Sequence, residues 1–197
     1  MFVTFEGLDG SGKTTQAELL ADAFRSEGRE VVATREPGGT PLGEELRRLV
    51  LEGVDMSAWA EAALFAAARA ELASRVIAPS LHAGKDVISD RYIDSSLAYQ
   101  GLARGLGVDK VLELNLVATH GLLPDWTVLV LVDPEVALSR SRVSDRIERE
   151  SLDFHRAVDS AYRELAAMFP NRILAFDGSR AAAEIAKEIR GRLRDLS

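Results

Sequence analysis

The sequence predicts an α/β fold in which a five-stranded parallel sheet is flanked by helices. Expected strands and helices alternate along the chain, which is the order that builds parallel sheets through helical crossovers. The expected strands are continuous apolar runs, as in strands that are covered on both faces. Ligands bind such sheets beyond the carboxyl ends of the strands, so we expect a site at that edge.

Five short apolar segments are the expected strands. The first leads directly into a glycine-rich loop, and the fourth (WTVLVLVD) is uniformly apolar. The segments are 1–6, 30–36, 86–90, 126–133 and 172–177. Their carboxyl ends carry Glu6, Arg35, Asp90, Asp133 and Asp177. These side chains are therefore candidates for a site at one edge of the sheet.

Segments with helical apolar spacing separate the strands. Gly28 stands where the first helix should stop, Ser57 is a suitable N-cap for a long alanine-rich helix, and Pro134 opens the helix after the fourth strand. Residues 139–150 contain four arginines without a regular pattern, which makes them the candidate insertion. The expected helices are 13–28, 41–52, 58–84, 109–120, 134–142, 150–169 and 181–193.

The composition limits the classes of protein to consider. A chain of 197 residues suits one domain, 1–197, and 47% apolar with 28% charged residues is an ordinary globular mixture. The net charge of −7 lacks the basic footprint of a nucleic-acid-binding protein. The apolar runs are too short to span a bilayer, the N-terminus lacks a signal peptide's apolar core, and there is no cysteine. We therefore expect a cytoplasmic protein that binds neither nucleic acid nor a membrane.

Residues 7–14 (GLDGSGKT) match the phosphate-binding pattern G-x-x-x-x-G-K-[ST] between an expected strand and an expected helix. Glycines let backbone N–H groups wrap the phosphates, and the helix N-terminus adds its positive end. Lys13 is expected to reach the β- and γ-phosphates and the Thr14 hydroxyl to ligate Mg²⁺. The pattern predicts a P-loop NTPase fold whose nucleotide lies against Gly7, Leu8, Asp9, Gly10, Ser11, Gly12, Lys13, Thr14 and Thr15. It leaves open whether the phosphate goes to water, to a second molecule or nowhere.

The segment 86–101 is the second strong signal, and with it the chain resembles the thymidylate kinases. The resemblance is collinear over essentially the whole chain. It includes FEGLDGSGKTTQ, TREPGGTPLGE, LFAAARAE, DRYIDSSLAYQG, DRIERESLDFHRAVDSAYRELA and FDGS. It implies that a homodimer transfers the γ-phosphoryl group of ATP to dTMP, with Mg²⁺, in dTTP synthesis.

The resemblance also assigns roles on the acceptor side. Asp9 is expected on the sugar 3′-hydroxyl, Phe65 stacked on thymine, and Arg69, on the same helix face, at a thymine carbonyl. Arg91 is expected to bridge the two nucleotides, because their phosphates repel each other unless fixed cations lie between them. Tyr99 is expected to pack where a ribose 2′-hydroxyl would project. The residues expected to bind dTMP are Asp9, Arg35, Phe65, Arg69, Arg91, Ser96, Tyr99 and Gln100.

The expected lid is the segment 139–150. The phosphate loop lacks the basic residue that some thymidylate kinases carry there, so the resemblance implies the type with catalytic arginines in a lid. Arg140 is expected on adenine and Arg146 near the transferring phosphate, while Arg142 and Arg149 have no assigned roles. The expected catalytic residues are Lys13, Arg91, Asp9 and Arg146; further ATP contacts are Arg140, Ser179 and Arg180; and Mg²⁺ lies at Thr14 and Asp90.

Two other functions agree with parts of the sequence. The chain could phosphorylate another nucleoside monophosphate or a deoxynucleoside, although a nucleoside has less need of so many acceptor-side arginines. It could also be a nucleotide-gated binding protein without transfer activity. The complete set of Lys13, Thr14, Asp90 and Arg91 favours catalysis over that alternative.

Overall fold

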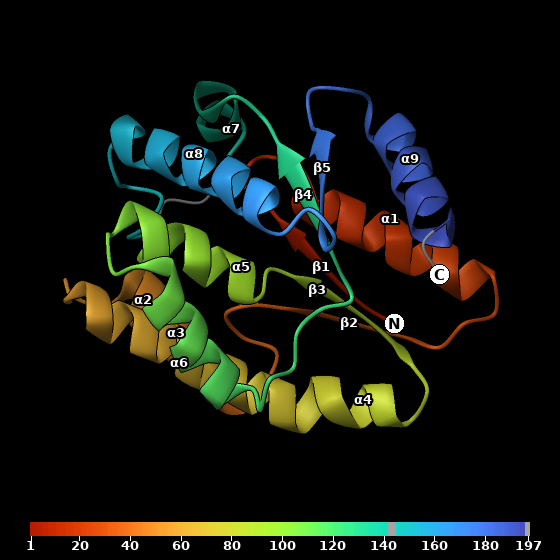
Figure 1. The fold of residues 1–197 in the computed structure, drawn as a ribbon, viewed down its shortest axis with the longest axis horizontal. Helices are drawn as coiled ribbons and strands as arrows, with labels where there is room; N and C mark the ends of the chain where they lie inside the picture. The colour runs from red at the N-terminus through yellow and green to blue at the C-terminus, as the bar shows by residue number, and fades with distance from the viewer. Residues whose placement is uncertain (142–144, 196–197) are drawn as a thin grey trace.

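The computed structural model describes residues 1–141 and 145–195 and centres on a five-stranded parallel sheet (Figure 1). The strand order is β2-β3-β1-β4-β5, and every neighbouring pair is parallel. The strands are β1 (Phe2–Glu6), β2 (Val31–Arg35), β3 (Asp86–Asp90), β4 (Trp126–Leu131) and β5 (Ile173–Asp177). All five expected strands are therefore confirmed, with small differences at their ends.

Helices cover both faces of the sheet (Figure 1). The helices α1 and α9 pack together on one face, where Phe24, Ile185 and Ile189 meet the apolar side chains of the sheet. The other face carries α3, α5, α6 and α8, and α2 packs against α3. The bounds are α1 (Lys13–Ser26), α2 (Pro41–Glu52), α3 (Ala58–Leu72), α4 (Ala78–His82), α5 (Ile93–Ser96), α6 (Val108–Ala118), α7 (Pro134–Arg140), α8 (Leu152–Met168) and α9 (Ala182–Asp195).

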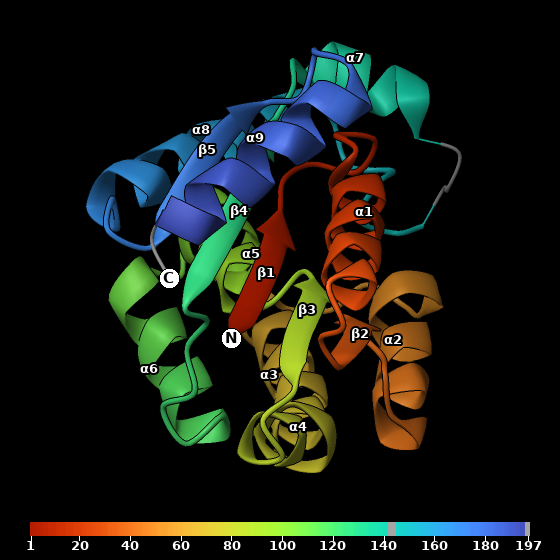
Figure 2. The same ribbon diagram turned by 90° about the vertical axis from the view of Figure 1, so that its right-hand side faces the viewer.

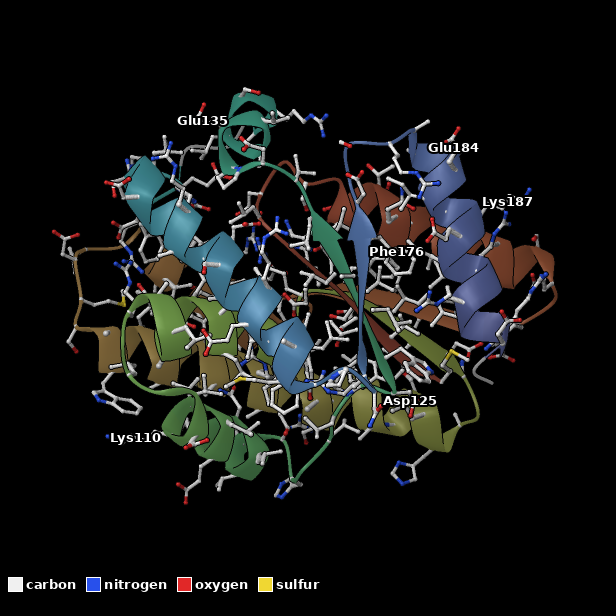
Figure 3. The ribbon with its side chains drawn as sticks, turned by 45° about the horizontal axis from the view of Figure 1, so that its top comes forward. Lys110, Asp125, Glu135, Phe176, Glu184 and Lys187 are labelled. Atoms are coloured by element: carbon white, nitrogen blue, oxygen red, sulfur yellow. The ribbon has the colours of Figure 1, made fainter. Side chains whose placement is uncertain are left out.

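Burial explains why the apolar pattern predicted the strands. Within β1, every side chain is buried, whereas β2 is only partly covered because it is the edge strand of the sheet. Phe176 of β5 lies on the side of α9, while Glu184 and Lys187 of that helix point to solvent (Figure 3). The expectation that strands are covered on both faces therefore holds for the central strands and fails for the edge strands β2 and β5, which both have exposed residues.

Two helical segments differ from the sequence prediction. The expected helix 58–84 is divided into α3, the π-helical segment η1 (Ala73–Ile77) and α4, and Pro79 lies in the first turn of α4, where a missing N–H is tolerated. The prediction also missed α5 and the π-helical segment η2 (Leu97–Ala103). These missed segments carry part of the expected acceptor pocket, because Ser96 ends α5 and Tyr99 and Gln100 lie in η2.

The expected lid is described only in part. Helix α7 ends at Arg140, and residues 145–150 form turns before α8. Residues 142–144, including Arg142, and residues 196–197 lie outside the described residues. Across the part of the chain that the structure describes, no helix is both long and apolar enough to cross a membrane.

The carboxyl ends of the strands place the expected site at one end of the molecule. Figure 2 shows the strands pointing toward the end where α7 lies. Glu6 and Asp90 end the neighbouring strands β1 and β3, and the phosphate loop follows β1 directly. This is the edge at which parallel sheets bind ligands.

Candidate active site

The phosphate loop connects β1 to α1 and is packed tightly on both sides. Gly7 and Gly10 have backbone φ angles of 138° and 81°. A Cβ on Gly7 would lie 2.4 Å from the Val130 carbonyl oxygen, and one on Gly10 would lie 2.1 Å from the Ala137 carbonyl oxygen of α7. Both positions therefore require glycine, and the loop is held between β4 and the helix that leads into the expected lid.

Asp9 lies between two cations at the centre of this loop. Its Oδ1 atom is 2.7 Å from Lys13 Nζ and 2.8 Å from Arg91 Nη2. Burial alone would raise the pKa of Asp9, but the charges and hydrogen bonds of Arg91 and Lys13 outweigh it and hold that pKa well below its usual range. An ionised Asp9 thus holds both cations next to the loop that receives the phosphates.

Arg91 is held in place by several partners. Its backbone φ is 72°, an uncommon value for a residue with a side chain. Its Nη1 donates to Ser95 Oγ at 2.9 Å and to Tyr162 Oη at 3.2 Å, and its guanidinium lies 5.4 Å from the centre of the Tyr99 ring. With the Asp9 contact, these bonds fix the guanidinium toward the phosphate loop.

Glu6 supports this arrangement from below. It is fully buried and accepts hydrogen bonds from the Tyr92 backbone N–H at 2.8 Å, from Ser95 Oγ and from Tyr162 Oη at 2.9 Å. Burial, with the nearby charge of Asp94, raises the pKa of Glu6 despite these donors. Glu6 is thus a second carboxylate next to Arg91; the sequence placed it at a strand end facing the site but assigned it no specific role.

A cleft opens beside the phosphate loop, and it combines aromatic with polar side chains, as small-molecule sites usually do. Asp9 and Arg91 form the wall that it shares with the loop, and Phe65 and Tyr99 provide aromatic surface. The cleft is lined by Asp9, Glu36, Pro37, Arg47, Leu51, Phe65, Arg91, Ser95, Ser96, Tyr99, Gln100, Asp145, Ile147 and Glu148. Besides Asp9, five other residues expected to bind dTMP therefore line this cleft: Phe65, Arg91, Ser96, Tyr99 and Gln100.

Arg69 lies behind this wall rather than on it. Its Nε donates to Glu36 Oε2 at 2.8 Å, and its Nη1 donates to Ser96 Oγ at 2.9 Å and to Asn115 Oδ1. Its Nη2 donates to the Tyr92 carbonyl at 2.9 Å and pairs with Glu36 at 2.7 Å. The guanidinium is thus fully engaged inside the protein, and it reaches the cleft only through Ser96 and Glu36.

Glu36 is the buried partner of Arg69 and also lines the cleft. Burial raises its pKa to about 7 against the opposing effect of Arg69. Since Oε2 takes the Arg69 bonds, Oε1 is left buried without a hydrogen-bond partner among the described residues. Glu36 therefore presents a spare polar atom at the cleft wall.

Arg47 lines the cleft in which Arg35 was expected, and Arg35 lies elsewhere. Arg35 is 52% exposed, pairs with Glu44 at 3.0 Å, and lines a separate hollow beside α1. Arg47 of α2 instead lines the cleft and donates to the Pro37 carbonyl at 2.9 Å. The structure does not bring Arg35 to the acceptor cleft, and sequence reasoning missed Arg47, which stands in a run of charged residues with no distinguishing signal.

Glu61 accepts hydrogen bonds from three side chains, two of them on or next to η2 and one in the turns before α8. Its Oε1 accepts from Gln100 Nε2 at 2.8 Å, and its Oε2 accepts from Arg146 Nη2 at 2.6 Å. Arg104, near the end of η2, donates to both oxygens at 3.4 Å and to Glu150 at 2.7 Å. Arg146 is thus held against the acceptor side of the molecule and not against the phosphate loop.

Thr14 and Asp90 lie together at the expected magnesium site. Thr14 Oγ1 donates to Asp90 Oδ2, while Asp90 Oδ1 is buried without a hydrogen-bond partner among the described residues. Within residues 1–141 and 145–195, no group of three or more acidic or histidine side chains is arranged to hold a metal ion. Mg²⁺ in phosphate sites keeps several waters and takes only one or two protein ligands, so a hydroxyl and a carboxylate fit it.

The expected adenine side is more open. Arg140 Nη1 is 3.5 Å from the Gly178 carbonyl oxygen, which brings the end of α7 next to Ser179. The Ser179 N–H donates to Asp177 Oδ1 at 2.9 Å, and Arg180 pairs with Glu188 of α9. Arg140 and Ser179 are therefore neighbours, whereas Arg180 is directed along α9.

Unpaired polar atoms concentrate around this region. Of the five buried side-chain oxygens without a hydrogen-bond partner in the described part of the chain, four lie at the phosphate loop, the magnesium site or the cleft. They are Ser11 Oγ, Asp90 Oδ1, Glu36 Oε1 and Glu148 Oε2. Because buried polar groups normally have partners, this clustering indicates surfaces that bind polar ligands.

Several of these residues were missed from the sequence. Glu36 lies in the TREPGG segment and Glu148 in DRIE, two motifs in which only the arginines were assigned roles from the sequence. Glu61 lies on the alanine-rich helix α3 and Tyr162 on the amphipathic helix α8, and neither residue stands in a pattern that indicates a role.

Replacing Arg146 by alanine distinguishes a role at Glu61, where the structure places it, from the expected role at the transferring phosphate. Because the change leaves the buried Glu61 short of a donor, we expect a higher KM for dTMP and a lower Tm. Steady-state kinetics with each substrate and thermal unfolding measure both, with the exposed Arg156→Ala as the control. A large fall in kcat with an unchanged KM for dTMP would instead place Arg146 at the transferring phosphate.

Comparison with known proteins agrees with this geometry. The thymidylate kinase family model matches residues 5–189. The chain is 49% identical over 189 residues to a thymidylate kinase of Synechococcus sp. (strain JA-3-3Ab), covering 96% of this chain and 93% of that one. It is 47% identical over 194 residues to a thymidylate kinase of Symbiobacterium thermophilum, covering 96% and 91%.

A solved structure shows the same architecture. The crystal structure of thymidylate kinase from Ehrlichia chaffeensis superposes with a TM-score of 0.82 at 34% identity, and the match covers 98% of each chain. The expected P-loop fold with a five-stranded parallel sheet is thereby confirmed. From its phosphate loop to its last helix, this chain belongs to the thymidylate kinase family.

Proposed function

We propose that the protein transfers the γ-phosphoryl group of ATP to dTMP, giving dTDP and ADP. The position of Asp9 and Arg91 supports this most strongly, because the pair joins the phosphate loop to a second cleft that can hold a nucleotide. A phosphatase or a switch protein has no use for such a second cleft. Membership of the thymidylate kinase family supports dTMP as the acceptor.

The chemistry follows from the charges in the site. An oxygen of the acceptor's 5′-phosphate attacks the γ-phosphorus, and the bond to the β–γ bridging oxygen of ATP breaks to release ADP. The attacking oxygen is already ionised at neutral pH, so no general base is required, and the protein mainly positions groups and cancels charge. Lys13 and Arg91, both held by Asp9 Oδ1, provide two fixed cations where the phosphate loop meets the cleft.

Thr14 and Asp90 would hold Mg²⁺ for this reaction. The buried, unpaired Asp90 Oδ1 and the Thr14 hydroxyl are oxygen ligands of the kind that Mg²⁺ prefers. When bound with ATP, Mg²⁺ would neutralise charge on the β- and γ-phosphates.

We also propose that the segment 139–150 is a lid that supplies arginine to the phosphates. The phosphate loop has no arginine of its own, and Arg140 already lies at the end of α7, which packs on Gly10. Arg146 could join the phosphates only after leaving Glu61 and the Val50 carbonyl. Arg142 lies outside the described residues, and Arg149 is exposed.

A homodimer remains our proposal for the assembled protein. Helices α2, α3 and α6 lie side by side and expose the large apolar side chains Leu42, Leu49, Trp59 and Val117. Exposed large apolar side chains on neighbouring helices are a usual feature of subunit contacts. The mass of the protein in solution tests this proposal, and a monomer at all concentrations would contradict it.

Location in the cytoplasm stays a prediction from the sequence.

A panel of monophosphates tests the proposed reaction. With ATP and Mg²⁺, we expect dTMP to give a higher kcat/KM than dCMP, dGMP, AMP or unphosphorylated thymidine. A Lys13→Met preparation made in the same way excludes contaminating kinases. Faster turnover of another monophosphate, or of thymidine, would support the corresponding alternative kinase, and ATP binding without any transfer would support a nucleotide-gated binding protein.

A further inference from the structure

Two polar side chains form one part of the cleft wall. Ser96 and Gln100 are four residues apart on the α5–η2 segment, so they share a face, and each is 1% exposed. Both line the cleft, and both are also bonded from behind by a charged residue. Those charged partners decide which hydrogen-bonding group each side chain can offer to a ligand.

Glu61 decides the orientation of Gln100. An ionised carboxylate can only accept hydrogen bonds, so the Gln100 amide must turn its NH₂ group toward Glu61 Oε1, at 2.8 Å. The amide oxygen then faces away from Glu61, and no described residue is seen donating a hydrogen bond to it. Gln100 therefore offers the cleft an acceptor.

Arg69 decides the orientation of Ser96 in the opposite sense. A guanidinium can only donate, and Arg69 Nη1 donates to Ser96 Oγ at 2.9 Å. The Ser96 hydroxyl hydrogen is then free to be donated to a ligand. The wall thus places a donor from Ser96 beside an acceptor from Gln100.

Glu61 is well suited to stay ionised in this position. It is 2% exposed, and burial opposes its charge, but hydrogen bonds from Gln100 and Arg146 and the charges of Arg104 and Arg146 outweigh burial and lower its pKa. Arg146 donates to Oε2 at 2.6 Å and Gln100 donates to Oε1 at 2.8 Å, while Arg104 lies farther off, at 3.4 Å from each oxygen. The shortest bond to Oε2 therefore comes from a cation, and the shortest bond to Oε1 comes from the Gln100 amide.

The wall matches one kind of pyrimidine edge. Thymine presents an acceptor, O4, beside a donor, N3–H, whereas cytosine presents an amino donor beside the acceptor N3. We propose that Glu61 is a positioning residue that selects against cytosine by fixing the Gln100 amide oxygen toward the base. This inference rests on the proposed dTMP kinase activity, and it concerns which residue sets the base selectivity of that site.

The variant Glu61→Gln tests this directly. Arg146, which donates to Oε2 at 2.6 Å, should hold the oxygen of the new amide at that position, which directs its NH₂ group toward Gln100. The Gln100 amide would then turn over and present its own NH₂ group to the base. We expect kcat/KM to fall for dTMP and to rise for dCMP, so that the dTMP/dCMP ratio drops about tenfold or more.

The controls separate selectivity from folding. Glu71→Gln makes the same change on the same helix at an exposed pair with Arg75, and it should leave the ratio unchanged. Glu61→Asp keeps the negative charge that the two arginines require, but its shorter side chain cannot reach Gln100 as well, so the ratio should fall there too. The KM for ATP should stay unchanged in all three variants.

The outcomes distinguish this inference from the proposed function. A wild-type protein that does not prefer dTMP would contradict the proposed function itself. A wild type that prefers dTMP, with Glu61→Gln and Glu61→Asp variants that keep the ratio, would overturn only the role of Glu61. A lower Tm with an unchanged dTMP/dCMP ratio would also overturn it, because a residue with only a structural role would lower the turnover of both substrates together.

Discussion

Replacing Arg91 by alanine should lower kcat by about a thousandfold, which is the scale of arginine contributions in other phosphoryl-transfer enzymes. The guanidinium is held by Asp9, Ser95 and Tyr162 at the junction of the phosphate loop and the cleft. Charge there stabilises the transition state more than either bound nucleotide, so KM should change far less than kcat. Steady-state kinetics against ATP and dTMP measure both constants.

Two further variants make the Arg91 experiment specific. Arg91→Lys keeps one positive charge without the fork, so it should recover only part of the activity. Arg163→Ala removes an exposed arginine that pairs with Asp159 on α8, and it should keep normal turnover. If Arg91→Ala kept a near-normal kcat and only its Tm fell, the arginine would be a structural partner of Asp9 and not a catalytic residue.

Replacing Lys13 by methionine should lower kcat about a hundredfold to a thousandfold, because a preorganised cation at the developing charge is lost. Methionine keeps much of the apolar stem, and Asp9 retains Arg91 as a partner, so the loop should still fold. The fall should again exceed any rise in the KM for ATP. Single-turnover measurements separate the transfer step from product release.

The matched control for Lys13 is Lys187→Met, which removes an exposed lysine from the outer face of α9 (Figure 3). It should have normal kinetics. A Lys13→Met variant whose kcat is unchanged while the KM for ATP rises would show that the lysine binds ATP equally in the ground and transition states. In that case Arg91 would remain the principal fixed cation of the site.

The order of the fold could be read from local patterns. Continuous apolar runs located all five strands, and G-x-x-x-x-G-K-[ST] located the phosphate loop, because both signals lie within a few neighbouring residues. The π-helical segments could not be read in this way. In η1 and η2 the backbone departs from the regular helical period where packing requires it, so the sequence pattern predicted one long helix and missed the other segment.

The candidate site divides along the same line. The sequence by itself placed Asp9, Lys13 and Thr14 on one loop and Asp90 and Arg91 at the end of a strand, where short-range geometry leaves little choice. Only the tertiary structure put Glu61 between Gln100 and Arg146, turned Arg69 inward behind Ser96, and left Arg35 on the surface. A pattern shows which face of an element a residue occupies. The partner of a long charged side chain depends on which distant segment packs against it, because its charge must be compensated wherever it is buried.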